Sequence, residues 1–448
     1  MKILLVCFEF PPLGGGGVQR SMAFSKYLPQ FGITPITVTT DLDSFKIQME
    51  NHPIDESHLE RLHQDLIVER VSCPGRFKHT LGKFGTWRSI FFSLVEQQAK
   101  CWRPELDRDL PQLIEKYRPE AIYVSLPPFG MGPLWVEISQ KYSLPLIVDF
   151  RDAWSQWRVS PYGSWFHYAL TLLLERRCLK AAAHVICSSD QIRADLLKLH
   201  QGVAPEKLVT ITNGYDVDVI DWSINRGQDG GKFIIGYVGN FYYSPKARDS
   251  MMTPWWRKRP NRMIQYAPRK EDWLYRSPYF FFRAVKALLD EHPVLKDRLR
   301  IRFAGSKPDW IDEQVNFFEL AEIVEFVGYL DHESVIQFQT ECDALLVTSS
   351  KVIGGCDYSI AGKTFEYFTM KKPIIGFVTE GAQKKILEQS GMAIVCDPDD
   401  VNTSVVQLLK LIRRESVLTP NNDFLDSLHR KNLTQRLAEV LHEIVPGH

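Results

Sequence analysis

The sequence predicts an α/β protein of two doubly wound, Rossmann-like domains that face each other across a cleft. Two observations predict this fold class. Short apolar runs rich in β-branched residues alternate with segments of helix length, which is the pattern of a parallel sheet covered by helices. The alternation stops once, at a polar stretch, and then restarts, so the 448 residues divide into two sheets.

The predicted strands follow one another in two series. The first series comprises residues 2–8, 33–40, 121–126, 144–150, 183–189 and 207–213. The polar stretch "NRGQDGGK" (225–232) is typical of a linker. The second series comprises residues 233–240, 299–305, 324–329, 344–350, 372–378 and 392–396. We therefore expect an N-terminal domain over 1–220, a C-terminal domain over 232–415 and a helical segment over 416–448 that packs back toward the N-terminal domain.

Composition excludes some partners and compartments. Lys plus Arg and Asp plus Glu number 54 each, so no overall charge attracts nucleic acid. No apolar run at the start is long enough to predict a signal peptide, and the longest one, 165–175, is shorter than the ~20 residues of a membrane span. The eight cysteines form no CxxC pair, which favours a reducing, cytoplasmic location.

A run of four glycines separates the first predicted strand from the first predicted helix, in "EFPPLGGGGVQR" (9–20). Each glycine costs backbone entropy on folding. That cost is explained if an anionic group rests against the backbone at the helix N-terminus, where N–H groups and the helix dipole favour negative charge. From the glycines alone, a flexible loop explains the run equally well.

A second candidate anion site lies in "GKTFEYFTMKKPIIG" (362–376). Gly362 and Lys363 open a predicted helix, which suits a diphosphate. Glu366 follows one turn later, and its carboxylate can accept hydrogen bonds from the two hydroxyls of a ribose. The alternative is a solvated lysine and glutamate pair on a helix surface.

The order of these motifs resembles the GT-B glycosyltransferases, and within them glycosyltransferase family 4. The resemblance starts with the apolar strand, "PP", the glycine-rich turn and an amphipathic helix, and it covers residues 2 to about 415. Further matching motifs are "IVDFRDAW" (147–154), "LLERRCLKAAAHVICSSD" (173–190), "ITNGYD" (211–216), "VEFVGYLDHESV" (324–335) and "GKTFEYFTMKKPIIG".

The resemblance implies donor-binding positions. Gly15, Gly16 and Gly17 match the turn that lies against the donor phosphate and the transferred sugar. Gly239 matches the glycine close to the diphosphate, and Glu366 matches the glutamate that binds the ribose. The remaining implied positions, which hold the nucleotide base, are Val327 and Tyr329.

The chain departs from the family pattern at three positions. Tyr358 stands where the family has a first glutamate, so we expect Asp357 to replace it toward the donor sugar. Asn240 stands where the family has an arginine. The family lysine that follows has no counterpart; its nearest candidates are Lys246 and Arg248, and Lys363 can take over part of the phosphate charge.

The resemblance also implies the reaction, in which a sugar moves from a nucleotide-diphosphate donor with retention and without a bound metal. Backbone N–H groups and cations must then neutralise the departing diphosphate. No Asp-x-Asp or HExxH motif is present, so we expect neither a metal nor a cofactor besides the donor. The acceptor is expected to be a glycan or a lipid-linked molecule of cell-surface synthesis. Two alternatives stay open, a nucleotide-sugar epimerase or hydrolase of the same fold and a non-catalytic GT-B partner subunit.

The stretch "DFRDAW" offers Asp149, Arg151 and Asp152 at the end of a predicted strand. A carboxylate there can orient an acceptor hydroxyl or stabilise positive charge on the sugar, and Arg151 can bind an acceptor phosphate. The alternative is a structural Asp–Arg pair that caps the following helix.

Residues 242–278 form an insertion relative to the family, with nine basic and three acidic residues and with interleaved tryptophans. Tryptophan and arginine together suit an anionic lipid surface. The alternative is a loop over the donor site whose arginines hold the diphosphate. A second aromatic and basic segment, 83–103, favours the membrane and predicts a peripheral protein on its inner face.

Overall fold

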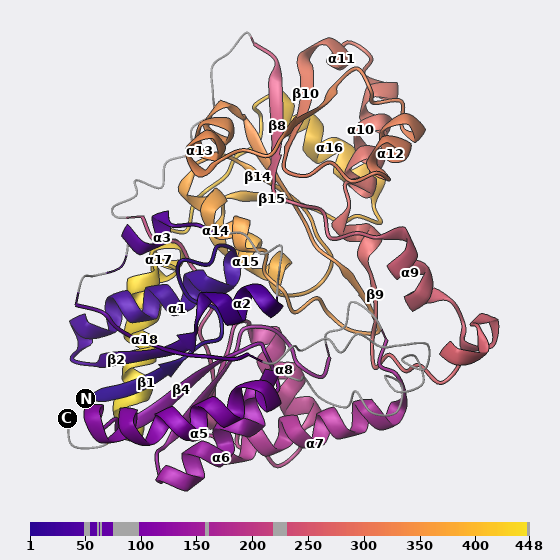
Figure 1. The fold of residues 1–448 in the computed structure, drawn as a ribbon. Coiled ribbons are helices and arrows are strands. Elements are labelled where there is room, and N and C mark those ends of the chain that lie inside the picture. Colours follow the sequence, from indigo (N-terminus) through magenta and orange to yellow (C-terminus); the bar gives the residue numbers. More distant parts are fainter. Residues whose placement is uncertain are drawn as a thin grey trace. The chain divides into compact units, whose positions relative to one another are not determined.

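A computed structural model describes residues 1–48, 54–60, 62, 65–74, 98–156, 161–217 and 231–445. The chain forms two compact units (Figure 1). The N-terminal unit contains Met1–Asp216, Pro254–Pro268 and Arg430–His448. The C-terminal unit contains Val217–Thr253 and Arg269–His429. Most of the predicted linker, residues 225–230, lies outside the described residues.

The N-terminal unit is built on a parallel sheet with strand order β3-β2-β1-β4-β5-β6-β7. Its strands are β1 Lys2–Val6, β2 Thr34–Thr40, β3 Ile67–Val71, β4 Ala121–Leu126, β5 Leu146–Phe150, β6 His184–Cys187 and β7 Leu208–Thr210. Its helices are α1 Gly16–Tyr27, α2 Leu42–Gln48, α3 Ser57–Glu60, α5 Gln98–Tyr117, α6 Met131–Tyr142, α7 Trp165–Ala181, α8 Asp190–Leu199 and α18 Arg430–Ile444. Short 3₁₀ helices are η1 Leu28–Phe31, η2 Pro205–Lys207, η3 Trp255–Arg257 and η4 Pro260–Arg262.

The core of this unit lies between the sheet and the helices α1 and α18. Phe24 of α1 and Leu437 and Leu441 of α18 pack on strand residues such as Leu5 and Ile147. Helices α5, α6 and α7 gather along the other face (Figure 1). From β1 the chain adds β2 and β3 on one side of the sheet, and then β4 to β7 on the other side, so the switch point of the topology lies between β1 and β4. Ligands of open α/β sheets bind at such a switch point.

The C-terminal unit contains a second parallel sheet, with strand order β11-β10-β8-β12-β14-β15. Its strands are β8 Phe233–Val238, β10 Leu299–Ala304, β11 Val324–Gly328, β12 Ala344–Thr348, β14 Ile374–Phe377 and β15 Ala393–Cys396. A short antiparallel ribbon joins β9 Lys270–Asp272 to β13 Lys351–Ile353. The helices are α9 Pro245–Met252, α10 Tyr279–Glu291, α11 Leu295–Arg298, α12 Ile311–Phe317, α13 His332–Glu341, α14 Gly362–Thr369, α15 Ala382–Ser390, α16 Val401–Ile412 and α17 Asn422–Ser427, with the 3₁₀ helix η5 Trp273–Arg276.

The core of the C-terminal unit lies between this sheet and helices α10, α12 and α16. Phe281 and Leu288 of α10 and Leu408 of α16 are buried against strand residues such as Ile235 and Phe303. The order of its six sheet strands repeats that of the first sheet, so its switch point lies between β8 and β12. The fold class predicted from the sequence, two parallel-sheet Rossmann-like domains, is confirmed.

The predicted insertion is divided between the two units. Residues 254–268 belong to the N-terminal unit because Tyr266 forms an antiparallel bridge with Tyr162, with N···O distances of 2.7 and 3.1 Å. The flanking pieces, which contain α9, β9 and η5, belong to the C-terminal unit. The insertion therefore differs from the single C-terminal element that we expected.

The second aromatic and basic segment, 83–103, is described only from residue 98 onward, so residues 83–97 lie outside the described part. Trp102 is fully buried, and its indole N–H donates to the carbonyl of Val71 at 3.1 Å. This tryptophan is a core residue of the N-terminal unit, so it takes no part in the membrane contact expected of the segment 83–103. In the parts of the chain that the structure describes, no helix is both long and apolar enough to cross a bilayer.

Candidate donor site

The glycine turn follows β1 at the switch point of the N-terminal sheet. Gly15 has a φ of +92° and is the N-cap residue of α1, so no N-cap side chain accepts a hydrogen bond from the first N–H groups of this helix. A Cβ atom on Gly16 would meet no atom within 4 Å. The first N–H groups of α1 therefore border open space, which is the geometry that an anionic group requires.

Arg151 ties the glycine turn to the end of β4. Its guanidinium donates to the carbonyls of Gly17, of Leu126 at 3.3 Å and of Pro127 at 2.8 Å. These bonds hold the turn in place and leave Arg151 less free for an acceptor phosphate than we expected. Asp152 follows Arg151 in the chain and is half-buried, and its catalytic role stays a prediction.

Glu9 is a residue of this site that the sequence did not single out. A Cβ atom on Gly17 would overlap the Glu9 carboxylate and lie 2.9 Å from Nη1 of Arg151. Any larger residue at position 17 would have to displace the ends of both charged side chains. The signal that could have identified Glu9 is its place between the first strand and the glycine turn.

Asp149 does not face a binding site. Its carboxylate has 0% exposure and accepts hydrogen bonds from Nε and Nη2 of Arg20, at 2.7 and 3.1 Å, and from the hydroxyl of Tyr123. Arg20 also donates to the carbonyl of Thr212 at 2.8 Å. Burial alone would lower the pKa of Arg20, but the Asp149 carboxylate raises it. A carboxylate without exposed atoms touches no substrate, so we replace its expected catalytic role by a structural one, and its partner is Arg20 of α1.

Lys363, Gly239 and Gly362 meet at the switch point of the C-terminal sheet. Gly239 follows β8 with a φ of +102°, and a Cβ atom there would lie 3.3 Å from Nζ of Lys363. The ammonium of Lys363 lies over the ring of Tyr237, 3.5 Å from its centroid. A Cβ atom on Gly362 would meet nothing within 4 Å, and Ala361 provides no side-chain cap to α14. The site thus combines an open helix N-terminus with a cation.

The charge of Lys363 depends on its surroundings. Burial lowers the pKa of Lys363 to about 7, the nearby Glu366 carboxylate opposes this shift, and Arg276 adds to it. Among the described residues, Lys363 forms neither a hydrogen bond nor an ion pair. A bound anion would therefore add a direct counter-charge to this ammonium, besides the nearby Glu366 carboxylate.

The positions expected to hold the nucleoside are accessible. Glu366 is exposed on α14, one turn after Lys363, and Tyr329 is 86% exposed after β11. Val327 is half-buried in β11. Their roles toward ribose and base stay predictions.

The residues at or near the positions of the missing family cations differ in their contacts. Asn240 accepts a hydrogen bond from the N–H of Ser306 at 3.0 Å and so shapes the loop after β10. Arg248 forms a two-bond ion pair with Asp272 at 2.6 and 2.7 Å, which occupies its guanidinium. Lys246 is exposed on the first turn of α9. The pairing gives Arg248 a structural role within the insertion, and its contact with the phosphate stays a prediction.

Asp357 is 1% exposed and shapes the loop before α14. One carboxylate oxygen accepts hydrogen bonds from the N–H and hydroxyl of Ser359, at 3.1 and 2.8 Å, and the other accepts one from the N–H of Ser350 at 3.1 Å. These bonds satisfy the carboxylate within its own loop. A direct contact with the donor sugar, which we expected of Asp357, is therefore replaced by a positioning role.

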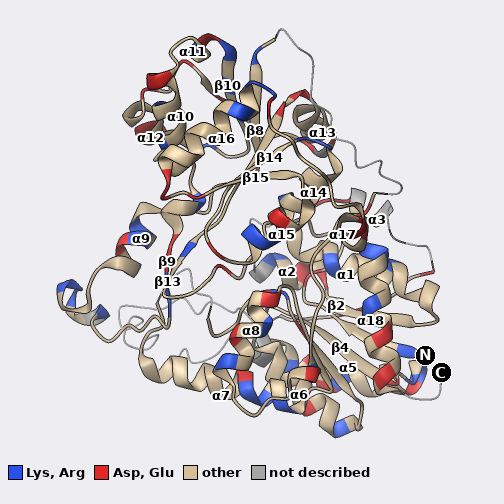
Figure 2. Cartoon of the chain, turned by 180° about the vertical axis from the view of Figure 1, so that it is seen from behind, with Lys and Arg blue, Asp and Glu red and all other residues tan. Residues whose placement is uncertain are grey.

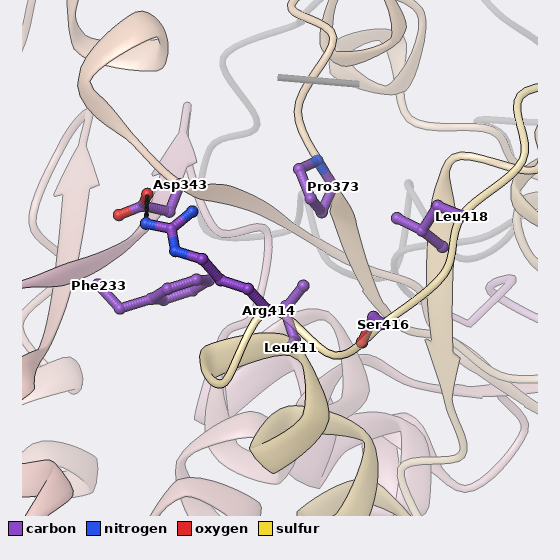
Figure 3. Close-up of a pocket in the computed structure, with 7 residues that line it drawn as sticks. All are labelled: Phe233, Asp343, Pro373, Leu411, Arg414, Ser416 and Leu418. Atoms are coloured by element: carbon purple, nitrogen blue, oxygen red, sulfur yellow. Dashed lines mark hydrogen bonds and ion pairs between the residues drawn. The ribbon is translucent and has the colours of Figure 1, made fainter. Parts of the chain in front are cut away.

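A small pocket of the C-terminal unit lies away from these residues (Figure 3). Phe233, Asp343 and Pro373 line it at the amino ends of strands, where Asp343 accepts hydrogen bonds from Arg414 at 3.1 Å and from the N–H of Ile234 at 2.9 Å. Ligands of parallel sheets bind at the carboxyl ends. The pocket therefore belongs to the packing of α16 on the sheet.

Comparison with known proteins finds one family model that matches part of the chain and solved structures that share its fold. Residues 15–214 match the family model described as a glycosyl transferase 4-like domain. No curated protein matches the sequence.

Three of the similar solved structures match nearly the whole chain. Sucrose-phosphate synthase from Thermosynechococcus elongatus has 13% identity, covers 99% of both chains and gives a TM-score of 0.60. Anabaena Alr3699/HepE in complex with UDP has 13% identity, covers 99% of this chain and 100% of its own, and gives a TM-score of 0.58. The apo form of the lipopolysaccharide outer core galactosyltransferase WaaB has 11% identity, covers 99% of both chains and gives a TM-score of 0.57. At these identities the likeness shows the fold.

Proposed function

Because this chain has the GT-B fold and carries a glycosyl transferase 4-like domain over residues 15–214, we propose that it transfers a sugar from a nucleotide-diphosphate donor to an acceptor. One observation carries this proposal. A lysine that has no ion-pair partner among the described residues and a helix N-terminus without a side-chain cap meet beside Gly239 at the switch point of the C-terminal sheet. The complex of the similar Anabaena protein with UDP supports a nucleoside diphosphate as the ligand.

The same residues support a mechanism that needs no metal ion. The bond between the sugar and the diphosphate breaks as negative charge gathers on the leaving phosphate. The ammonium of Lys363 and the first N–H groups of α14 stabilise that charge. The family resemblance supports retention at the anomeric carbon and a glycan or lipid-linked acceptor, for a role in cell-surface polysaccharide or glycolipid synthesis.

We expect Glu366→Gln to weaken nucleoside diphosphate binding by about 1.5–3 kcal/mol, the usual contribution of hydrogen bonds to a charged group. The neutral amide keeps the shape of the side chain but accepts weaker bonds from the ribose hydroxyls. Calorimetric titration with UDP and with GDP measures this change. Glu322→Gln, at an exposed carboxylate of the same unit, is the matched control. Unchanged affinity in Glu366→Gln would remove this residue from the ribose site.

We further propose that residues 254–268 rest on an anionic membrane surface. Trp255 and Trp256 are 59% and 64% exposed, and Met263 and Ile264 are exposed close to the bridge at Tyr266. The stretch contains no acidic residue, and its four cations are Arg257, Lys258, Arg259 and Arg262. These cations lie in the segment that follows α9 along the chain (Figure 2).

The anchoring of this stretch supports the same surface. The ring of Tyr266 lies 5.0 Å from that of Tyr168 in α7, which holds the stretch on the N-terminal unit. Trp165 and Phe166, at the start of α7, are both exposed. Exposed aromatic rings beside cations suit the headgroup region of a bilayer. This arrangement favours a cytoplasmic protein that binds the inner face of the membrane peripherally.

We expect the protein to sediment with phosphatidylglycerol vesicles at low salt and much less at high salt, because each cation near the surface contributes about 1 kcal/mol. The variant Trp255→Ala/Trp256→Ala/Arg257→Ala should lose this binding. Phe317→Ala, at an exposed ring of the other unit, should retain it. Equal sedimentation of the triple variant and the parent would contradict the membrane surface.

A further inference from the structure

The second half of the insertion reaches the switch point of the C-terminal sheet. The hydroxyl of Thr348, the last residue of β12, donates to the carbonyl of Arg276 at 3.0 Å. This bond fixes Arg276, the last residue of η5, at the carboxyl end of a central strand. Ligands of parallel sheets bind at this edge.

The guanidinium of Arg276 is held in one direction. It lies over the ring of Trp273, with Cζ 4.8 Å from the centroid, and Nη2 donates to the hydroxyl of Ser359. Ser359 belongs to the loop that leads into α14. The insertion therefore delivers a positioned arginine to the loop before Lys363.

Arg276 keeps free donors. The bond to Ser359 is its one side-chain hydrogen bond within the described part of the chain, and no carboxylate there pairs with it at ion-pair distance. Its remaining N–H groups are not among the buried polar atoms that lack a partner. A guanidinium offers five donors in a fork that matches phosphate oxygens. Most of this fork is available to a ligand.

Two acidic side chains stabilise the charged form of Arg276. Burial would lower the pKa of Arg276, but Asp357 and Glu271 raise it. Glu271 is 2% exposed and accepts a hydrogen bond from the indole N–H of Trp273 at 3.1 Å. Asp357 and Glu271 therefore favour the charged guanidinium while no anion is bound.

Arg276 and Lys363 lie at the same edge of the sheet, and the positive charge of Arg276 lowers the pKa of Lys363. Two such cations with unused donors suit a ligand with two adjacent phosphates. We propose that Arg276, which the insertion supplies, binds the diphosphate of the donor together with Lys363. Arg276 thereby replaces the family arginine, at whose position this chain has Asn240. This inference rests on the proposed function and adds the residue that completes its site.

The test compares nucleoside diphosphate and nucleoside binding. We expect Arg276→Gln to bind UDP or GDP at least about tenfold more weakly than the parent, because one charge-assisted contact is lost. The affinity for uridine or guanosine should stay unchanged, and Arg276→Lys should restore part of the diphosphate affinity. Arg302→Gln, whose guanidinium pairs with Glu325 and Glu341, is the matched control and should bind as the parent does.

The outcomes separate this inference from the proposed function. If the parent protein binds no nucleoside diphosphate, the proposed function fails. If the parent binds and Arg276→Gln binds equally well, or loses nucleoside affinity to the same extent, the assignment of Arg276 fails alone. A second measurement uses the unaltered protein, in which bound UDP or GDP should protect Arg276 from phenylglyoxal. Equal modification with and without the nucleotide that binds would overturn the assignment.

Discussion

Asp149→Ala is expected to lower the free energy of unfolding of the N-terminal unit by about 3–5 kcal/mol, the usual loss when one partner of a buried ion pair is removed. Arg20 is only 5% exposed, and the substitution leaves its guanidinium without a carboxylate. Tyr123 loses a hydrogen-bond acceptor as well. Urea unfolding, followed by circular dichroism, measures the change.

A double variant separates charge from packing. Arg20→Met with Asp149→Leu removes both charges and keeps apolar volume, so its stability should lie much closer to that of the parent. Asp149→Ala within about 1 kcal/mol of the parent would contradict the structural role, since surface substitutions have effects of that size or smaller.

Lys363→Met is expected to reduce sugar transfer by about 10²–10³-fold, the range for removing one group that stabilises transition-state charge. The fold should persist, because Lys363 forms no ion pair with any residue that the structure describes. Initial rates of nucleoside diphosphate release measure the loss. The exposed Lys296, which pairs with Glu322, offers a matched control in Lys296→Met. Equal rates in Lys363→Met and the parent would place Lys363 outside the reaction.

Lys363 also gives diphosphate binding a pH dependence of defined sign. Its pKa of about 7 in the free protein means that the ammonium loses its proton as the pH rises through neutrality. Binding of a dianion favours the charged form, so affinity should fall as the pH rises above about 7. The phosphates titrate equally in Lys363→Met, so the difference between the two proteins isolates the lysine. Identical pH profiles would contradict this assignment.

The main sheets could be predicted because their strands are local apolar runs. All twelve predicted strands correspond to strands of the structure. The strands β9 and β13 were not predicted, because "KED" and "KVI" are three residues long and their pairing joins segments about 80 residues apart. The strand β3, "IVERV", was also not predicted, and two charged residues interrupt its apolar pattern.

The candidate site was predictable where one short motif contains it. Gly362 and Lys363 are adjacent in the sequence and predict an anion site, and the structure brings Gly239, which the family resemblance also implies, next to Lys363. The sequence favoured a catalytic role for Asp149 as much as a structural one. Its partner Arg20 lies 129 residues away in the chain, so the sequence does not show that the carboxylate is buried and paired. Arg276 is one of nine cations in the insertion, and only its contacts with Thr348 and Ser359 distinguish it.

We propose that protein cations, rather than a metal ion, hold a donor diphosphate while its sugar moves to an acceptor. The most direct test incubates the protein with UDP-sugars and GDP-sugars, with and without a membrane extract as acceptor, and repeats each reaction in EDTA. We predict that one donor releases its nucleoside diphosphate only when acceptor is present, that EDTA leaves this rate unchanged and that Lys363→Met lowers it by about 10²–10³-fold. Consumption of a donor without acceptor, or loss of transfer in EDTA that magnesium or manganese restores, would contradict the account.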